Sequence, residues 1–489
     1  MILVYLFHFI LYEINVSIFP ISGFDLTNLW ENIVDIGILG ILLALVLLMY
    51  LAYKGMSVIW LAPILALLAA AFSSGTHLMA SYTEVFMLSA ANYVKLYFPA
   101  FLLGAIFGKI MDDSGAAKAI AKVIVDKVGS QNAILAVVLA VSVLTYGGVS
   151  MFVVVFAVYP IAAQIFRDSN VPKRLIPGAI ALGSFTYTMT ALPGSPQIQN
   201  TIAMPFFGTT AYAAPMLGII GTLVMFGLGM IWLKRREAVA RANGEGYGHH
   251  VDDVSSDDTN IPSAFLAFVP IAIVLVLNFV IVTFYYPSID TSYLAQYGTS
   301  LQKVNGMWSL IIALTVAIVV ALFLFRKNLK DMRFSLNEGG ESSILPILNT
   351  AAAVGFGNVI KSLSSFDVIK DGILAIPGTP LLSFAMSTSL LAGITGSASG
   401  GLSIALDALG QVYIHKAMEM GISLEALHRI ASIACGGLDS LPHNGAVITL
   451  LGICGMTHRD SYKDIFICTL VIPTVATVAV VAFAAMHVV

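Results

Sequence analysis

The sequence predicts an all-α protein that crosses a lipid bilayer several times. Of its 489 residues, 58% are hydrophobic and only 10% are charged, whereas soluble domains carry about 25% charged residues. Many apolar windows also approach the ~20 residues that a helix needs to cross the hydrocarbon core. These two observations indicate a polytopic membrane protein. The net charge of −3, without a basic patch, gives no reason to expect nucleic acid as a partner.

Eight apolar windows are predicted to form membrane helices, at residues 34–52, 57–73, 92–111, 214–233, 263–285, 306–326, 343–361 and 464–486. The first twenty residues are apolar too, but Glu13 interrupts them, and they lack the basic segment and cleavage site of a secretory signal. They are assigned to a first helix, and the sequence alone does not establish whether this helix crosses the membrane.

The one long hydrophilic stretch, residues 234–262, is predicted to be a cytoplasmic linker. It contains two histidines and several aspartates, but without ligand spacing a solvated linker is expected rather than a metal site. Lys234, Arg235 and Arg236 end one apolar window, and a second basic group follows the window at 306–326. Placing both groups in the cytoplasm satisfies the positive-inside rule. The three cysteines lack disulfide or metal-ligand spacing, and no cofactor is expected.

Two apolar regions broken by Gly, Pro, Ser and Thr, at 133–213 and 380–456, resemble each other. When the chain is aligned with itself at a shift of 249 positions, several residues coincide: Gly147 with Gly396, Ser150 with Ser399, and Leu192-Pro193 with Leu441-Pro442. The predicted spans start the first copy from the cytoplasm and the second from outside. The sequence therefore predicts an inverted repeat, an architecture of many secondary transporters.

Each copy contains the same two features. In the first, two apolar arms meet at a Gly/Ser tip, at 146–150 and 396–401. Each arm has only about fifteen residues, so a re-entrant hairpin is expected rather than two spans. In the second, Pro and Gly interrupt a helix, at 191–196 and 440–445. Non-helical backbone at membrane depth is tolerated only inside protein or beside a wet cavity. The four elements are therefore predicted to form a polar site for a carboxylate.

These features divide the chain into N-terminal scaffold helices at 1–91, a first transport repeat at 92–213, further scaffold helices at 214–342, a second transport repeat at 343–456, and a C-terminal helix at 457–489. The predicted substrate-binding residues are Gly147, Ser150, Ser195, Gln197, Asn200, Asn349, Thr350, Ser397, Ser399, His443 and Asn444. Asp439 and His443 are the candidates for ion coupling, because ionisable groups inside a membrane are costly and usually functional. A single Ser or Thr can simply bond its own helix, so the argument rests on the cluster.

Three stretches carry a family resemblance: MDDSGAAKAIAKVIVDKVG from Met111, GSFTYTMTALPGSPQIQNT from Gly183, and ESSILPILNTAAAVGFGNVI from Glu341. They are similar to the gluconate permease family of bacterial proton symporters, which includes 3-hydroxybutyrate permeases. The similarity runs from about Tyr97 to Asp464. It implies a scaffold, a transport domain of inverted repeats, elevator-like movement, and often a homodimer in the bacterial cytoplasmic membrane. It also implies proton-coupled uptake of small hydroxylated monocarboxylates.

One departure from the family pattern bears on the substrate. Sugar-acid members carry a histidine beside Pro and Gly in the first break. Here that segment, Leu192-Pro-Gly-Ser-Pro196, has none, and the histidine is His443 in the second break. The departure favours a shorter acid such as 3-hydroxybutyrate over gluconate.

Two other functions fit parts of the sequence. Tips rich in Ser and Gly also suit sodium, so a sodium-coupled carboxylate transporter is the alternative. An intramembrane hydrolase is a distant one. Its nucleophile motif G-x-S-x-G is not matched by GSASG at 396–400, because Ala398 occupies the serine position. The chain is therefore not expected to be an enzyme.

Overall fold

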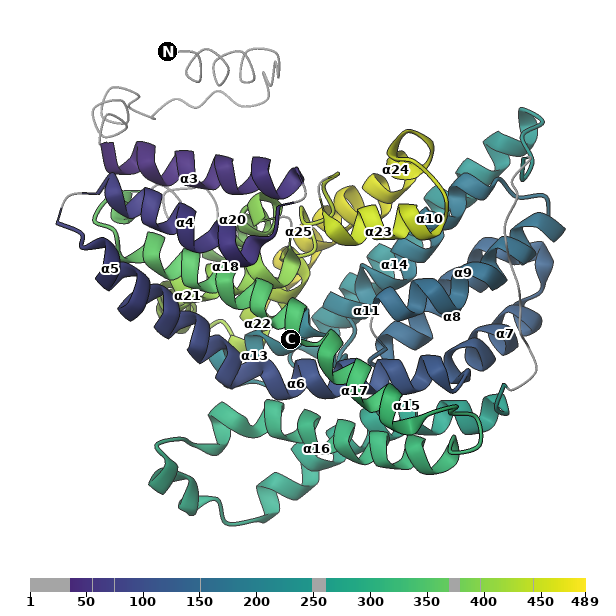
Figure 1. Cartoon of the computed structure of the whole chain (residues 1–489), viewed down its shortest axis with the longest axis horizontal. Coiled ribbons are helices and arrows are strands. Elements are labelled where there is room, and N and C mark those ends of the chain that lie inside the picture. The colour runs from purple at the N-terminus through teal and green to yellow at the C-terminus, as the bar shows by residue number, and fades with distance from the viewer. Residues whose placement is uncertain are drawn as a thin grey trace.

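The computed structural model describes residues 36–54, 56–73, 75–149, 151–248, 261–368, 379–395, 397–442 and 444–489. Every regular element in these ranges is a helix, which confirms the predicted all-α class (Figure 1). The predicted first helix within residues 1–20 lies outside the described residues.

Among the described residues, six helical segments are long and apolar enough to cross a bilayer: Leu78–Asp113, Pro215–Ala242, Ala264–Ser288, Lys303–Leu324, Met332–Ser362 and His458–Ala485. They contain the elements α5 (Leu78–Ala80), α6 (Leu88–Asp113), α14 (Pro215–Ala242), α15 (Ala264–Val280), α16 (Leu301–Leu324), α17 (Met332–Ser342), α18 (Ile344–Ser362), α24 (His458–Phe466) and α25 (Ile472–Ala485). Because α14 continues to Ala242, the hydrophilic segment predicted at 234–262 begins as a helix.

The other α-helices of the described residues are α3 (Ile36–Tyr53), α4 (Val58–Ala71), α7 (Ala116–Val128), α8 (Ala133–Tyr146), α9 (Met151–Asp168), α10 (Ile176–Ser184), α11 (Tyr187–Thr190), α12 (Ile198–Thr201), α13 (Ala203–Phe207), α20 (Pro380–Thr395), α21 (Ala398–Glu419), α22 (Leu424–Ala434) and α23 (Gly445–Ile453). Figure 1 shows α3 and α4 at one end of the molecule and α7, α8 and α9 at the other. The short helices α11, α13 and α22 lie between these ends.

Two pairs of helices pack closely across tight turns. Helix pair 1 is α8 with α9, and its turn contains Gly148 at φ +92°, a backbone conformation that glycine adopts readily. Helix pair 2 is α20 with α21, and Gly401 lets their backbones approach each other. A Cβ added at Gly401 would lie 2.2 Å from the Cα atom of Ala392. Small residues are what allow membrane helices to pack this closely.

Two non-helical segments interrupt helices in the middle of the molecule, between its two ends (Figure 1). Break 1 comprises residues 191–197, between α11 and α12, and break 2 comprises residues 435–444, between α22 and α23. The sequence predicts the second interruption at 440–445, whereas helix α22 ends earlier, before Gly436 and Gly437. Break 2 contacts the end of α11, directly before break 1, because a Cβ added at Gly436 would lie 3.3 Å from the Thr190 methyl carbon.

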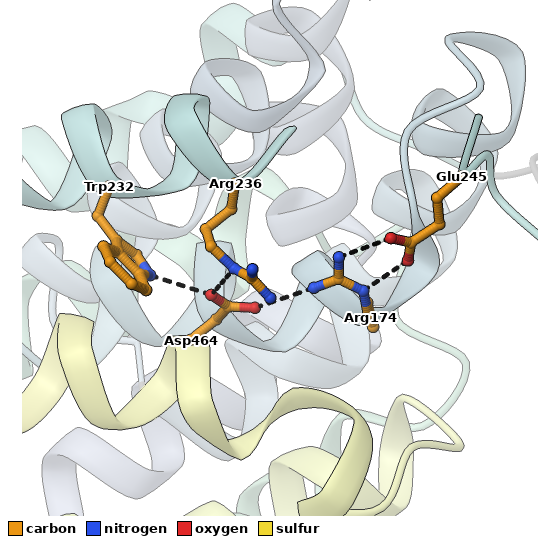
Figure 2. Close-up of polar contacts among 5 residues, drawn as sticks. All are labelled: Arg174, Trp232, Arg236, Glu245 and Asp464. Carbon is orange, nitrogen blue, oxygen red and sulfur yellow. Dashed lines mark hydrogen bonds and ion pairs between the residues drawn. The ribbon is translucent and has the colours of Figure 1, made fainter. Parts of the chain in front are cut away.

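A buried carboxylate joins three distant segments at another point in the fold (Figure 2). Asp464, in α24, has a side chain that is only 1% exposed. It accepts bonds from Arg236 Nε at 2.8 Å and Trp232 Nε1 at 3.0 Å on α14, and from Arg174 Nη1 at 3.4 Å before α10. Arg174 also forms a two-bond pair with Glu245, at 2.6 and 2.8 Å. The cluster, which we call the Asp464 cluster, ties the ends of α10, α14 and α24 together.

Candidate functional site

Break 1 is bonded to the turn of helix pair 1. Gln197 Nε2 donates to the carbonyl oxygens of Thr145 at 2.7 Å and Val149 at 3.3 Å. In return, the Tyr146 hydroxyl donates to the carbonyl oxygen of Pro193 at 2.7 Å. Hydrogen bonds in both directions therefore join the turn to break 1, and the Gln197 side chain bonds both ends of the turn.

Two other predicted residues hold the backbone of break 1 in shape. Ser195 Oγ donates to the Thr188 carbonyl at 2.6 Å. Asn200 Nδ2 donates to the carbonyl oxygens of Ser195 at 2.8 Å and Ala211 at 2.9 Å. Both side chains are fully buried. Because buried carbonyl groups are costly when left without a partner, these bonds stabilise the non-helical backbone.

The predicted Gly147 lies in the turn of helix pair 1 and packs against α15. A Cβ added at this position would lie 2.7 Å from side-chain atoms of Ile271. Gly147 therefore allows the backbone of the turn to lie close to α15.

Arg429 of α22, which sequence reasoning missed, bonds to the segments on both sides of break 1. The side chain is fully buried, and all five of its N–H bonds are used. Nε and Nη2 donate to the Ala213 carbonyl at 3.1 and 2.7 Å, and Nη2 also reaches Ala211 at 3.3 Å. Nη1 donates to the Thr190 carbonyl at 3.2 Å and to Asn200 Oδ1 at 3.0 Å. Every one of these acceptors is neutral. Within the part of the chain that the structure describes, Arg429 forms no ion pair.

His428 adds a second contact between α22 and this region. Its Nε2 lies 3.1 Å from Asn200 Oδ1, and its Nδ1 lies 2.6 Å from Thr209 Oγ1. The Asn200 amide nitrogen donates to two carbonyls, so its oxygen is the acceptor that faces the imidazole. The imidazole therefore carries its hydrogen on Nε2 and accepts the Thr209 hydroxyl on Nδ1. Ser432, one turn further along, donates to the carbonyl oxygens of Thr190 and Gln199 at 2.9 and 3.1 Å.

A comparison of the two sequence copies could have found these residues. Shifting by 249 positions places Arg429 over Ile180 and His428 over Ala179. A polar pair in one copy therefore stands where the other copy is apolar. The signal was overlooked because α22 also carries the exposed Glu425, which makes the segment resemble an ordinary helix at the membrane surface.

Break 2 contains Asp439 and Asn444. Asn444 caps α23, since its Oδ1 accepts the backbone N–H groups of Ala446 and Val447 at 2.7 and 3.1 Å. Its Nδ2 donates to the Asp439 carbonyl at 2.9 Å. The half-buried carboxylate of Asp439 accepts the Ser440 hydroxyl at 3.0 Å. Asp439 therefore lies within break 2, where Ser440 bonds its carboxylate and Asn444 bonds its main-chain carbonyl.

The remaining predicted residues lie on helix pair 2 and on α18. Ser397 caps α21 by accepting the Gly400 N–H at 3.2 Å, and its hydroxyl lies 3.3 Å from that of Ser399. Helix pair 2 adjoins break 2, because a Cβ added at Gly393 would lie 2.9 Å from Leu438 Cβ. Asn349 and Thr350 lie on α18, where Thr350 is buried and Asn349 is half-buried. Ser150 and His443 lie outside the described residues.

Two buried polar atoms near break 1 have no hydrogen-bond partner among the described residues. They are Thr145 Oγ1, at the end of α8, and Gln199 Oε1, in α12. Buried polar groups are rarely left unpaired, so unpaired atoms beside a broken helix are candidates to bind a ligand. Neither residue is among the binding residues predicted from the sequence. Across the described ranges, no group of three or more His, Cys, Asp or Glu side chains could hold a metal ion.

Comparisons with known proteins find transporters that are similar in sequence and in fold. Residues 36–486 match the GntP family permease profile. The chain is 46% identical over 460 residues to the uncharacterized transporter YxjC of Bacillus subtilis (strain 168), covering 90% of this chain and 97% of that protein. It is 26% identical over 395 residues to an uncharacterized transporter of Haemophilus influenzae, covering 78% and 83%.

Solved transporters share the fold. The Alcanivorax borkumensis YdaH transporter superposes with a TM-score of 0.54 at 14% identity, covering 90% of this chain and 98% of that one. Neisseria gonorrhoeae MtrF, whose structure illuminates a class of antimetabolite efflux pumps, gives 0.53 at 14% identity, covering 88% and 94%. At this identity the likeness concerns the fold alone.

The family match covers nearly the whole chain, and the long apolar helices suit a multi-pass protein of the bacterial inner membrane. These findings indicate a transporter rather than an enzyme. The chain belongs to the GntP family of permeases.

Proposed function

We propose that this permease takes up a small hydroxylated monocarboxylate, of the size of 3-hydroxybutyrate, together with protons. The observation that carries the proposal is Arg429. Its guanidinium is fully buried against the segments that flank break 1, and neutral oxygens satisfy its hydrogen bonds. The bonds satisfy the N–H groups, but the positive charge remains. A carboxylate beside the breaks would be attracted to that charge, and more strongly than in water.

Two helix N-termini add to this attraction. Helix α21 begins at Ala398, at the tip of helix pair 2, and α23 begins at Gly445, at the end of break 2. The N-terminus of a helix carries a partial positive charge and favours anions. In broken membrane helices, such ends commonly face an anionic substrate. The substrate carboxylate is therefore proposed to bind between helix pair 2 and the breaks.

The unpaired atoms near break 1 favour a substrate that also carries a hydroxyl group. Gln199 Oε1 can only accept a hydrogen bond, so its ligand partner must be a donor. Thr145 Oγ1 can either donate or accept. A hydroxyl group a few atoms from the carboxylate satisfies both requirements. The distance to be spanned is short because the end of α11, directly before break 1, contacts break 2, which suits a compact acid better than a six-carbon sugar acid.

The proposed transport cycle uses the predicted architecture. The repeats at 92–213 and 343–456 are proposed to form an inverted pair that carries the site across the membrane against the remaining scaffold helices, in a homodimer. Asp439 and His443 are proposed to receive the coupled proton beside the bound acid. Gly147, Ser150, Ser195, Gln197, Asn200, Asn349, Thr350, Ser397, Ser399 and Asn444 are proposed to contact or frame the substrate.

Uptake of labelled 3-hydroxybutyrate into proteoliposomes tests this function. Uptake should follow an inward proton gradient, should not require sodium, and should persist in excess unlabelled gluconate. Uptake that requires a sodium gradient would replace proton coupling with the sodium alternative. Transport of gluconate in place of the short acid would contradict the substrate assignment.

A further inference from the structure

Exposed basic side chains gather where α16 ends and α17 begins. We call them the basic patch, and its members are Arg326, Lys327, Lys330 and Arg333. Within the described residues, none of the four forms an ion pair. The positive-inside rule places this end of α16 in the cytoplasm. That rule accounts for the side of the membrane on which these charges lie, but not for what they bind.

Other basic side chains on this side of the membrane are held by carboxylates. Arg174 pairs with Glu245 at 2.6 Å, and Lys109 pairs with Glu338 at 3.0 Å. The acid within the basic patch, Asp331, caps α17 instead, because its carboxylate accepts two main-chain N–H groups at 2.9 and 3.2 Å. The basic patch therefore keeps a net positive charge that an anionic partner would neutralise.

An apolar stripe on α16 leads to the basic patch. Its side chains are exposed and lie three or four residues apart, so they share one face of the helix. They are Ile312, Val316, Val319 and Phe323. The opposite face packs against the protein, where Ala317 and Ala321 are fully buried. Since α16 is long and apolar enough to cross the bilayer, the exposed stripe faces acyl chains.

The stripe has the length of one leaflet. From Ile312 to Phe323 the helix rises by about 16 Å, about half of the ~30 Å hydrocarbon core. Phe323, which is 69% exposed, ends the stripe, and the Arg326 guanidinium carbon lies 5.4 Å from the centre of its ring. A phospholipid of the inner leaflet whose acyl chain lies along the stripe would therefore bring its phosphate to the level of Arg326.

Helix α17 holds the other part of the basic patch at the membrane surface. Its buried Ser335 donates to Asp113 of α6 at 2.6 Å, which fixes one face of α17 to the protein. The start of the helix exposes Met332, Arg333 and Phe334, and Phe334 is 57% exposed. Exposed aromatic side chains beside basic ones are typical of segments that lie in the membrane interface. The basic patch and the stripe are thus parts of one surface.

We propose that this surface binds an anionic phospholipid of the inner leaflet. One acyl chain lies along the α16 stripe, and the phosphodiester lies among the four basic side chains. Arginine suits this partner because its guanidinium can give two parallel hydrogen bonds to one phosphate. A zwitterionic lipid binds less well, because the patch repels the ammonium of its headgroup. The proposal does not depend on the transported acid or on the coupling ion.

Native mass spectrometry of the detergent-solubilised protein tests the lipid site. Phosphatidylglycerol and phosphatidylethanolamine with the same acyl chains are added in equal amounts, and the retained lipids are released and identified. The wild type should retain phosphatidylglycerol in preference. Arg326→Gln combined with Lys327→Gln should lower the affinity for phosphatidylglycerol by about 25-fold, because each basic group near an anionic lipid contributes about fivefold. The same variant should leave phosphatidylethanolamine binding nearly unchanged.

A matched control removes two charges elsewhere on the same side of the membrane. Lys127 and Arg241 are exposed positions near one another, since the Ser169 hydroxyl donates to the Ser130 carbonyl at 2.6 Å and Arg241 donates to the Ser169 carbonyl at 3.2 Å. Lys127→Gln combined with Arg241→Gln should keep the affinity for phosphatidylglycerol within about twofold of the wild type, because neither charge adjoins the stripe.

A single variant covers the case in which the first double variant fails to fold. Lys330→Gln removes one exposed charge from the patch and should lower the affinity for phosphatidylglycerol by about fivefold. Arg326→Lys keeps the charge and should retain the preference for the anionic lipid.

Three results would overturn the lipid site. The first is equal retention of phosphatidylglycerol by the wild type and the patch variants. The second is displacement of the lipid by an equal concentration of soluble glycerol phosphate, which would show that the stripe contributes nothing. The third is a loss of the dimer mass in the patch variants with lipid retention unchanged, which would assign the surface to a second copy of this chain.

Discussion

Replacing Arg429 with lysine should loosen break 1 while keeping the buried positive charge. An ammonium group has three N–H donors at one point, whereas the guanidinium uses five, spread over four acceptors. At least two bonds are therefore lost. The lysine variant keeps the positive charge and loses only the geometry of the guanidinium, whereas an alanine variant would lose both.

The structure sets the size of this effect. A hydrogen bond to a charged group contributes about 1.5–3 kcal/mol, so two lost bonds correspond to about 3–6 kcal/mol. Two acceptors have other donors: the Ala211 carbonyl accepts Gly194 N at 2.8 Å, and the Thr190 carbonyl accepts Ser432 Oγ at 2.9 Å. Because these oxygens would not be left unpaired, the expected loss is near the lower limit, about 3 kcal/mol.

Thermal unfolding of the detergent-solubilised protein measures the change, and the apparent melting temperature should fall by about 3 °C. Arg241→Lys is the matched control. Arg241 is 51% exposed on its side chain and pairs with Glu237 one turn away, so its replacement should cost less than about 0.5 kcal/mol. A melting temperature of Arg429→Lys equal to that of Arg241→Lys would refute the role assigned to the guanidinium.

Three further predictions concern the Asp464 cluster and break 1. Asp464→Asn removes the buried charge that Arg174 and Arg236 share; since both arginines are partly exposed and can regain water, the loss should be about 2–4 kcal/mol in the same thermal assay. The hydrogen bonds from Arg174 hold the pKa of Glu245 below its ordinary value of 4.5, so their stabilisation is present above that pH and is lost as the pH falls below it. Arg174→Gln should therefore melt below the wild type at neutral pH and approach it in acid. Gln197→Leu removes the side-chain bonds between break 1 and the turn of helix pair 1. Substrate affinity, measured by exchange of labelled for unlabelled substrate in proteoliposomes, should fall about tenfold, which corresponds to about one hydrogen bond.

Much of the fold could be predicted because its signals are local. Apolar length located α15 and α16 to within a few residues, and Pro and Gly marked the interrupted helices. The errors have physical causes. The charged residues after Lys234 exclude a membrane span, but they do not prevent helical hydrogen bonding in water, so α14 continues to Ala242. Break 2 starts at Cys435 rather than near Ser440, because Gly436 and Gly437 end α22 first.

The site was less predictable, because its main contacts join residues far apart in the chain. Ser195, Gln197 and Asn200 stood out as polar residues beside Pro and Gly, and the structure places them together at break 1. The partners of Arg429 come from a loop more than two hundred positions earlier. No periodicity or spacing encodes that contact. Thr145 was missed for a similar reason, since an isolated threonine in an apolar helix is usually bonded to its own backbone.

The contacts of Arg429 also have an evolutionary consequence. Apart from Asn200, its acceptors are main-chain oxygens, which every amino acid supplies. Side chains at positions 190, 211 and 213 can therefore change among relatives, within the limits of packing, without removing an acceptor. No substitution in that loop can replace a lost arginine. A lineage that changes position 429 loses hydrogen bonds that no substitution elsewhere restores, whereas one that changes the side chains at positions 190, 211 and 213 keeps them.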